Sequence, residues 1–352
     1  MLLGFFLWLL AVPAVLCSGY LVLLAFAGKR RAAPAPSSDP KTRFVVLVPA
    51  HQEQTRIAST VTGLLLVDYP RELFEVFVVA DNCTDATREN AAQAGAQVID
   101  YFDPTRPGRG PALAHAFDHL LARANVPDAI FVVDPDAVVS PNVLRVLGAH
   151  LEQGERAILI DFDLRNPGSS WGTRMKRLAL AAFHRLPSLA RDQLGLSVGL
   201  PGDGMAFSVE TLRETRYQGA AGDNAYAIEL ARRHRRVAYA HEACVLGDIG
   251  PTRSAPRRRW RSAGLSLRAQ AVPALREAWT ARKDSARSRM LLDLAVDLLV
   301  PPLWALAPAV FLGALVSVVF SPWSLAWLPW GASLGTLVFY AVRSFSLENT
   351  EG

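Results

Sequence analysis

The stretch Phe-Val-Val-Asp-Pro-Asp-Ala, residues 131–137, decides the fold. Residues 130–133 are apolar and rich in β-branched side chains, which is typical of a buried strand. The strand then ends in two carboxylates, Asp134 and Asp136, which lie on the same side of an extended chain. In an open α/β sheet, ligands bind beyond the carboxyl ends of the strands. The stretch therefore predicts a divalent-cation site, and the alternative is an ordinary turn with two solvated acids.

The two ends of the chain are apolar, whereas its middle is polar. Of the 352 residues, 51% are hydrophobic and 20% are charged. Residues 2–27 form an uncharged apolar run that is long enough to span a bilayer, and Lys29, Arg30 and Arg31 follow it. A cleaved signal peptide is the alternative, but its basic residues would precede the apolar run. Because basic residues mark the cytoplasmic side, we expect the N-terminus outside and the chain to enter the cytoplasm at residue 29.

Charge and cysteine content exclude several other classes of protein. The net charge of +5 at pH 7 is too small to indicate a nucleic-acid-binding protein, and the basic residues cluster beside apolar segments. The three cysteines are scattered, with neither a zinc-binding spacing nor the pattern of a disulfide framework. We therefore expect a membrane partner and no nucleic acid.

Strand and helix patterns alternate between residues 44 and 151. The expected strands are residues 44–49, 74–80, 97–101 and 130–133, each followed by a helical pattern. No glycine-rich dinucleotide fingerprint follows the first strand, and residues 108–110 lack the Lys-Ser/Thr pair of a P-loop. The alternation predicts an α/β fold with a mostly parallel, doubly wound sheet.

Acids and amides follow the predicted strands at their carboxyl ends. They are Glu53, Asp81, Asn82, Asp85, Asp134 and Asp136. Such side chains suit the hydroxyl groups of a ribose, the edge of a base and a metal ion on a diphosphate. Arg109, at the start of a predicted helix, is a residue type that binds phosphate oxygens. The set indicates a nucleotide site at this edge of the sheet.

Four motifs, in this order, resemble those of the family 2 glycosyltransferases, which have the GT-A nucleotide-sugar-binding fold. Pro-Ala-His-Gln-Glu at residues 49–53 is similar to the family's Pro-Ala-x-Asn-Glu, with Gln52 in place of Asn. Residues 81–85 are similar to its second-strand acid motif, and residues 109–113 to its Gly-Lys-x-x-Ala-Leu stretch. Asp-Pro-Asp-Ala at residues 134–137 resembles its DxD motif.

The resemblance implies a nucleotide-sugar donor and a divalent metal cofactor, Mg²⁺ or Mn²⁺. It implies that Asp81 contacts the nucleobase and that Asp134 and Asp136 hold the metal ion, with Asp136 as the principal ligand. The donor-binding residues that it implies are Pro49, Ala50, Glu53, Asp81, Arg109, Asp134 and Arg259.

Residues 200–207 resemble the family's glycine-rich segment on the acceptor side. The resemblance implies that Gly202 and Gly204 line the acceptor site, where glycine permits close approach of a sugar. An ordinary hairpin is the alternative.

Ala-Gly-Asp-Asn at residues 221–224 resembles the family's Thr-Glu-Asp motif, with Gly222 in place of Glu. The resemblance implies that Asp223 is the catalytic base. The alternative is that Asp223 caps the helix that begins there, since Asp is favoured at that position.

Arg259 and Trp260 match the family's Gln-x-x-Arg-Trp motif, although Pro256 stands where Gln belongs. The resemblance implies that Arg259 lies near the diphosphate and that Trp260 lies under the acceptor sugar. The alternative for this segment is a basic stripe on anionic lipid headgroups. Residues 168–196 are amphipathic, and we expect a surface helix over the core, with a membrane-lying helix as the alternative.

We expect six segments along the chain. They are a transmembrane anchor (1–28), a linker (29–42), a GT-A glycosyltransferase domain (43–250), a basic amphipathic interfacial segment (251–290), two transmembrane helices (291–343) and a cytoplasmic tail (344–352). This arrangement predicts a multi-pass protein of the plasma (inner) membrane with a cytoplasmic catalytic domain.

The predicted function is that of a membrane-bound inverting hexosyltransferase. We expect it to move a sugar from a nucleotide sugar, with UDP as the expected nucleotide, to a lipid or lipid-linked acceptor. One alternative is a processive polysaccharide synthase, although residues 303–320 offer almost no polar lining for a polymer. Gly222 and Pro256 motivate a second alternative, a non-catalytic nucleotide-sugar-binding membrane protein. A nucleotidyltransferase shares the fold class but would not need Trp260.

Overall fold

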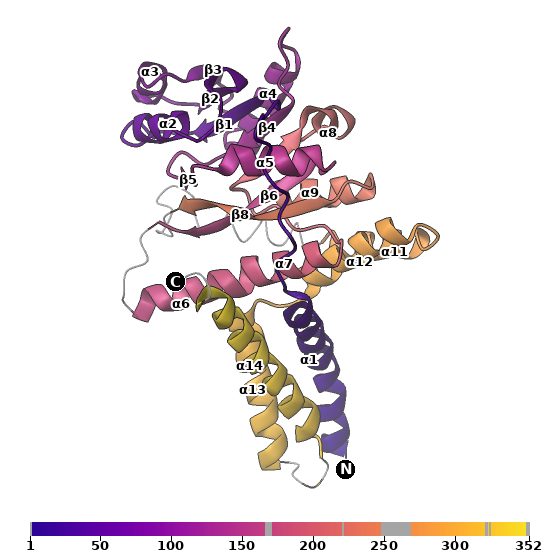
Figure 1. The fold of residues 1–352 in the computed structure, drawn as a ribbon. Helices are drawn as coiled ribbons and strands as arrows, with labels where there is room; N and C mark the ends of the chain where they lie inside the picture. Colours follow the sequence, from indigo (N-terminus) through magenta and orange to yellow (C-terminus); the bar gives the residue numbers. More distant parts are fainter. Residues whose placement is uncertain are drawn as a thin grey trace. The chain divides into compact units, whose positions relative to one another are not determined.

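The computed structural model describes residues 2–165, 171–219, 222–247, 269–320, 323 and 325–349 (Figure 1). Over these residues the chain forms two compact units. The first unit gathers three separate segments, Met1–Arg30, Gly168–Leu194 and Val296–Gly352. The second unit consists of Arg31–Pro167 and Gly195–Ala295. The amphipathic segment near residue 180 thus belongs to the same unit as the two apolar ends of the chain.

Within its described residues, the second unit is built on an eight-stranded mixed sheet of order β3-β2-β1-β4-β7-β6-β8-β5 (Figure 1). The strands are β1 (Phe44–Ala50), β2 (Phe74–Asp81), β3 (Gln97–Tyr101), β4 (Ala129–Val132), β5 (Val138–Val139), β6 (Ala157–Leu164), β7 (Met205–Ser208) and β8 (Val237–Gly247). The four predicted strands correspond to β1 to β4, and β3 has the predicted bounds.

The sheet is mixed, with four parallel and three antiparallel strand pairs over the described residues, so the predicted mostly parallel sheet is confirmed only in part. Strands β1 to β4 pair in parallel, and β6 pairs in parallel with β8. In contrast, β7 pairs antiparallel with both β4 and β6, and β5 pairs antiparallel with β8. The antiparallel direction of β7 follows from the path of the chain. After β6 the chain passes through the first unit and returns to the sheet beside β6, in the opposite direction.

Helices cover both faces of the sheet. The helices of this unit are α2 (Ile57–Leu65), α3 (Thr87–Gln93), α4 (Arg109–Leu121), α5 (Val143–Glu152), α8 (Val209–Glu214), α9 (Asp223–Arg232), α11 (Ala271–Thr280) and α12 (Ser285–Leu299), which runs on into the first unit. Alternate β1 residues pack in one core cluster with Ile57 of α2 and Leu144 of α5. On the other face, Phe207 of β7 stacks edge-on against Phe117 of α4 and Tyr226 of α9, with ring centroids 6.3 and 5.4 Å apart. Burial on both faces explains the uninterrupted apolar sequence of β1.

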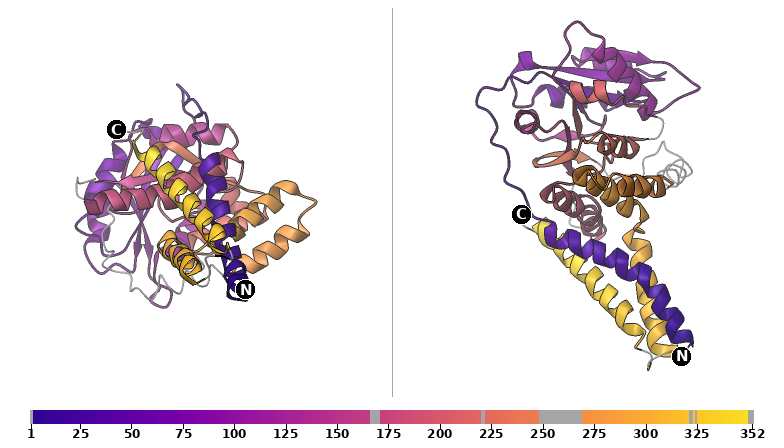
Figure 2. Two further views of the ribbon diagram at one scale, coloured as in Figure 1. Left: turned by 90° about the horizontal axis from the view of Figure 1, so that it is seen from below. Right: turned by 90° about the vertical axis from the view of Figure 1, so that its right-hand side faces the viewer.

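In the first unit, α1 (Leu2–Ala27), α13 (Leu303–Phe320) and α14 (Trp327–Asn349) lie side by side (Figure 2). Among the described residues, two helices are long and apolar enough to cross a membrane, Leu3–Ala27 and Leu303–Phe320. We predicted three spans, and α14 does form a continuous helix over the third. Its glycine, serine, threonine and charged residues keep it from matching the other two in hydropathy.

Within the first unit, the amphipathic segment packs on these apolar helices. It consists of α6 (Trp171–Leu180), a π-helical turn (Ala181–Arg185) and α7 (Leu186–Gln193). The Tyr340 hydroxyl of α14 donates to the carbonyl of Ala182 at 2.6 Å. Arg191 of α7 donates to the hydroxyl of Tyr20 in α1 at 2.7 Å and pairs with Asp297 at 2.6 Å. These contacts lie within the first unit, and the sequence did not predict them, since amphipathicity alone does not specify the apolar partner.

We predict that Gly313→Ala destabilises the first unit by about 1–3 kcal/mol, the usual cost of overpacking. A β-carbon at Gly313 of α13 would lie 2.4 Å from the Trp330 indole of α14. The indole cannot move away freely, because its Nε1 donates to the carbonyl of Leu7 at 3.2 Å. Gly335→Ala is the matched control, since that β-carbon has no heavy atom within 4 Å. Thermal unfolding in detergent compares the two variants, and equal melting temperatures would contradict this packing.

Candidate active site

The antiparallel pairing of β4 with β7 brings two sequence motifs together. Val132 lies opposite Met205, so the residues that follow β4 meet the residues that precede β7. The backbone N–H of Asp134 accordingly donates to Oδ1 of Asp203 at 3.2 Å. Gly204 has a φ of +68°, and a β-carbon there would lie 3.0 Å from a methyl group of Val245. Glycine thus allows the acceptor-side segment to pack tightly beside the acid pair.

Arg109 joins the acid pair to the acceptor side of the predicted site. It is the first residue of α4 and follows Gly108, which has a φ of +118°. Its Nε donates to Oδ1 of Asp134 at 3.1 Å, and its Nη1 pairs with Oδ2 of Asp223 at 2.5 Å. Its Nη2 donates to the carbonyl of Gly202. One guanidinium therefore holds the end of β4, the glycine-rich segment and the start of α9 together.

Burial determines the charge balance of this cluster. Burial and then the neighbouring Asp134 carboxylate raise the pKa of Asp203 to about 7. Burial also raises the pKa of Asp134, and the Asp136 carboxylate adds to this rise against the opposing effect of Arg109. Burial would lower the pKa of Arg109, but Asp134 and Asp223 outweigh it, so this pKa is raised. The arginine therefore stays charged, whereas burial favours the protonated forms of Asp134 and Asp203.

Asp223 is held by two side chains and does not cap its helix. Gly222, with a φ of +81°, stands at the cap position of α9, and Asp223 is the first helical residue. The alternative of a helix cap is therefore wrong. Oδ1 of Asp223 accepts a hydrogen bond from the Tyr217 hydroxyl at 2.5 Å, and Oδ2 pairs with Arg109. Its side chain is 14% exposed, so the carboxylate is oriented by these two partners and not by solvent.

The end of β2 supports the position of Arg109. Asp81, the last residue of β2, is 4% exposed. Its Oδ1 accepts a hydrogen bond from the side chain of Asn82 at 2.7 Å, and its Oδ2 accepts one from the backbone N–H of Gly108 at 3.0 Å. Asp81 thus fixes the residue before Arg109, which is a structural role alongside its predicted contact with a nucleobase.

The loop after β1 contains a residue in the left-handed region. Gln52 has a φ of 57°, a conformation that Asn adopts more readily, and Asn is the residue in the family motif. The Gln52 amide donates to the Thr84 hydroxyl at 2.7 Å and accepts from the backbone N–H groups of Thr84 and Asp85, each at 3.2 Å. The side chain therefore ties the first loop to the second despite the substitution.

Other residues predicted on β1 lie at the same edge. Pro49 and Ala50 end the strand, and the thiol of Cys83 donates to the carbonyl of Ala50 at 3.4 Å. The backbone N–H of Glu53 donates to the Thr87 hydroxyl at 2.8 Å. Burial raises the pKa of the Glu53 carboxyl above its ordinary value.

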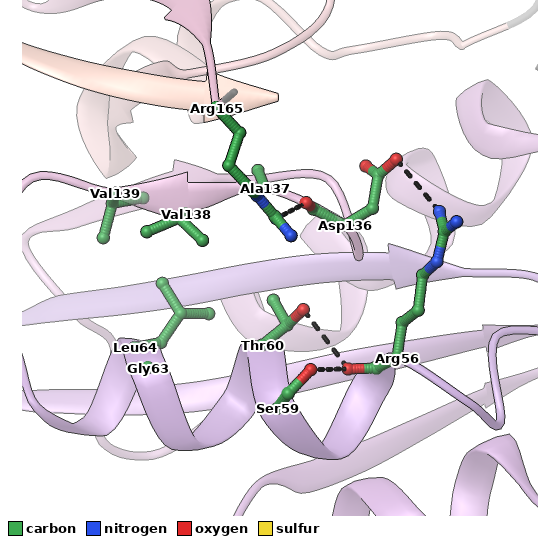
Figure 3. A pocket seen from close by; sticks show the side chains of 10 residues that line it. All are labelled: Arg56, Ser59, Thr60, Gly63, Leu64, Asp136, Ala137, Val138, Val139 and Arg165. Carbon is green, nitrogen blue, oxygen red and sulfur yellow. Dashed lines mark hydrogen bonds and ion pairs between the residues drawn. The ribbon is translucent and has the colours of Figure 1, made fainter. Parts of the chain in front are cut away.

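Asp136 lies between two arginines (Figure 3). Its Oδ2 is 3.5 Å from Nη1 of Arg56, and its carbonyl accepts a hydrogen bond from Arg165. Among the described residues, no group of three or more His, Cys, Asp or Glu is arranged to hold a metal ion. Asp134 and Asp136 nevertheless fit a hard divalent cation, because such ions often take one or two protein carboxylates and complete their shell with phosphate oxygens and water.

The structure brings together six of the twelve predicted site residues and adds two. Asp134, Asp136, Arg109, Gly202, Gly204 and Asp223 meet at one edge of the sheet. The prediction missed Asp203 and Tyr217. Asp203 stands between the two glycines of the acceptor motif, a signal that could have identified it, whereas nothing near Tyr217 in the sequence pointed to Asp223. Arg259, Trp260 and Pro256 lie outside the described residues.

Comparisons with solved structures found similar chains, of which one bears on the fold. The mannosyltransferase PcManGT from Pyrobaculum calidifontis, solved in complex with GDP-Man and Mn²⁺, is similar over 97% of this chain and 98% of its own, with a TM-score of 0.59 and 18% identity. Glucosyl-3-phosphoglycerate synthase from Mycobacterium tuberculosis, in complex with Mn²⁺, UDP and glucosyl-3-phosphoglycerate, is similar over 65% of this chain and 78% of its own, with a TM-score of 0.45 and 23% identity. The comparison with curated proteins found no match.

The sequence profile described as Glycosyltransferase like family 2 matches residues 40–271, which is more than half of the chain. That range contains all four motifs of the predicted donor site and the Arg109–Asp223 pair. The chain therefore belongs to the glycosyltransferase-like family 2, and its mixed sheet is a GT-A-like α/β fold.

Proposed function

We propose that the chain is a membrane-bound inverting glycosyltransferase that moves a sugar from a nucleotide sugar to a lipid or lipid-linked acceptor at the cytoplasmic membrane face. The observation that carries this proposal is the guanidinium of Arg109, which contacts both Asp134 and Asp223. Asp134 belongs to the predicted donor site and Asp223 to the predicted acceptor site. A single displacement needs this closeness, because nucleophile and leaving group must lie on opposite faces of one carbon atom.

The donor is a nucleotide sugar, and its diphosphate lies at Arg109, Asp134 and Asp136. The GDP-Man and Mn²⁺ in the mannosyltransferase complex support both the donor class and the use of Mn²⁺ or Mg²⁺. Asp134 and Asp136 would hold the cation, which when bound would offset the charge of the diphosphate. Asp81 ends β2 and Glu53 lies in the loop after β1, where the base and ribose are expected. UDP remains the predicted nucleotide.

Asp223 acts as the base. Its carboxylate takes the proton of the acceptor hydroxyl while the hydroxyl oxygen bonds to the anomeric carbon and the bond to the diphosphate breaks. Both oxygens of Asp223 are engaged before the donor binds, one by Tyr217 and one by Arg109. A diphosphate competes for the Arg109 guanidinium, so donor binding leaves one Asp223 oxygen for the acceptor. Arg109 then stabilises the negative charge of the departing nucleoside diphosphate.

The apolar helices support a membrane acceptor. Among the described residues, α1 and α13 have the length and composition of membrane spans, and the amphipathic α7 packs against α1. The Ser317 hydroxyl of α13 donates a hydrogen bond to the carbonyl of Gly313 in the same helix, at 2.7 Å. That helix therefore presents little polar surface to a sugar polymer, which favours transfer of one or very few sugars over processive synthesis.

Nucleotide-sugar turnover tests the proposal directly. We expect the purified full chain, supplied with membrane lipid extract, to release nucleoside diphosphate from one donor of a panel and to place labelled sugar in the organic extract. EDTA removes the cation, and Asp136→Ala removes the residue proposed as its principal ligand. Each is therefore expected to abolish release while the protein stays folded. Binding without release would favour the non-catalytic alternative, long water-soluble polymer would favour a synthase, and full activity in EDTA would remove the metal from the mechanism.

We predict that Asp223→Asn lowers kcat by about a hundredfold or more, the usual scale of a lost general base. Donor affinity is expected to stay close to that of the wild type, since the amide preserves the shape of the side chain. Nucleotide titration and steady-state kinetics on the same preparation separate the two quantities. If donor affinity falls in proportion to turnover, Asp223 serves the donor and is not the base.

We predict that Tyr217→Phe lowers kcat by about tenfold, because a hydrogen bond to a charged group contributes roughly 1.5–3 kcal/mol. Burial and then the Asp223 carboxylate raise the pKa of Tyr217, so its hydroxyl stays protonated and donates. Tyr226→Phe is the matched control, since Tyr226 stacks on Tyr217 but donates to the carbonyl of Thr215. Equal kcat values for the two variants would mean that Tyr217 does not position Asp223.

A further inference from the structure

A pocket of about 220 Å³ lies beside Asp136, between α2 and the chain that follows the acid pair (Figure 3). Its charged end is formed by Arg56, Asp136 and Arg165. Its other end is apolar and is lined by Gly63, Leu64, Val138 and Val139. Asp134, Asp223 and Gly202, which Arg109 joins, do not line this pocket, whereas Asp136 belongs both to the pocket and to the proposed donor site.

The charged end of the pocket carries more positive than negative charge. Of the described residues that line it, Asp136 is the one acid, and two guanidinium groups face it. Arg165 donates to the carbonyl of Asp136, which is a neutral group. Arg56 lies 3.5 Å from the Asp136 carboxylate, longer than an ordinary charge-assisted hydrogen bond. The lining therefore has one carboxylate against two guanidinium groups, and the nearby Glu53 carboxyl, which does not line the pocket, also interacts with Arg56.

Arg165 also has a hydrogen-bond donor with no acceptor. Among the residues that the structure describes, its buried Nε has no hydrogen-bond partner. Such a group is costly to bury unless a ligand satisfies it. The nearby hydroxyl groups are already used, because Thr60 donates to the carbonyl of Pro135 at 2.6 Å and Ser59 to that of Arg56 at 2.7 Å. Recognition at this end therefore depends on the two arginines, which favours an anion with several oxygen atoms.

We propose that this pocket binds a phosphate group of the acceptor, with the organic part of the acceptor along the apolar end. The assignment of the phosphate to the acceptor rests on the proposed function, while the binding of phosphate rests on the pocket itself. A phosphate presents enough oxygen atoms to accept from Arg56 and Arg165 at once. Leu64, Val138 and Val139 provide an apolar wall for the group esterified to it. A lipid-linked phosphate and a soluble phosphorylated molecule share this chemistry.

Calorimetric titration of the full chain in detergent, without donor, tests the proposal with glycerol 3-phosphate and butyl phosphate as probes. We expect the wild type to bind a phosphate ester, and Arg165→Gln and Arg56→Gln each to weaken binding about tenfold or more, as the loss of a charge-assisted hydrogen bond implies. Arg88→Gln is the matched control and leaves binding unchanged, since Arg88 pairs with Asp100 at 2.8 Å and does not line the pocket.

Val138→Asp provides a test that keeps both arginines in place. Val138 is 46% exposed at the pocket, so the variant adds a repelling carboxylate without removing a buried side chain. It is expected to weaken phosphate binding as the arginine variants do. Tighter binding of butyl phosphate assigns a lipid-linked phosphate, and binding of glycerol 3-phosphate that is as tight or tighter assigns a soluble phosphorylated acceptor.

Three results would overturn the proposal. The first is that the wild type binds neither ester, and the second is that the wild type and all pocket variants bind equally. The third is that saturating nucleoside diphosphate with Mn²⁺ displaces the ester, which would make the pocket part of the donor site. Because the readout is binding, it stands apart from glycosyl transfer. A chain that binds phosphate at these arginines yet turns over no donor would contradict the proposed function while leaving the pocket assigned.

Discussion

The charge on the Arg109 guanidinium is the constraint on which the rest of the site depends. Asp134 and Asp223 both contact it, and Asp203 lies against the backbone of Asp134. Carboxylates gathered in a half-buried cluster raise one another's pKa, and a buried charge without a partner is strongly destabilising. Arg109 opposes the rise in the pKa of Asp134 and Asp203, and it holds the Asp134 and Asp223 side chains in place. In the proposed function, the diphosphate and its cation would bind beside charged side chains that are already oriented.

The backbone around Arg109 explains how its side chain reaches so many partners. Asp81 holds the N–H of Gly108, which fixes the entry to α4. Gly110, the residue after Arg109, lies very close to Gly219. A β-carbon at Gly110 would clash with the Gly219 carbonyl oxygen. Gly219 also has a φ of +70°, which favours glycine. Two glycines thus let the first turn of α4 touch the segment before α9, and this contact sets the distance between Arg109 and Asp223.

Hydrophobic patterns in the sequence predicted the strands whose composition sets them apart from their neighbours. The apolar runs specified β1 to β4, and the acid pair was expected at the end of β4 because a strand composition stops there. The direction of β7 was not predictable, since a four-residue strand does not reveal which edge of the sheet the chain enters. The amphipathic segment near residue 180 posed a similar problem, because its apolar face fits α1 and α14 as well as it would fit a sheet.

The site shows the same division between local and long-range information. Residue type and motif order identified Asp134, Asp136, Arg109 and Asp223, but not that Arg109 contacts Asp223, which lies 114 positions further along the chain. The contact between the Tyr217 hydroxyl and Asp223 and the pocket beside Arg165 both depend on tertiary packing. The spacing of residues in the sequence therefore does not predict them. At Gln52 the sequence departs from the family motif, yet its amide still makes contacts between the two loops.

The most direct test of this account is the steady-state kinetics of Arg109→Gln beside the exposed Arg88→Gln. If one guanidinium organises both halves of the site, removing it lowers kcat/KM by about a hundredfold or more, the scale of a lost transition-state donor, and weakens donor binding as well. Arg88→Gln, whose arginine pairs with Asp100 at 2.8 Å outside the site, should then behave as the wild type. Donor affinity and kcat/KM near wild-type values in folded Arg109→Gln would contradict the central role given to this residue.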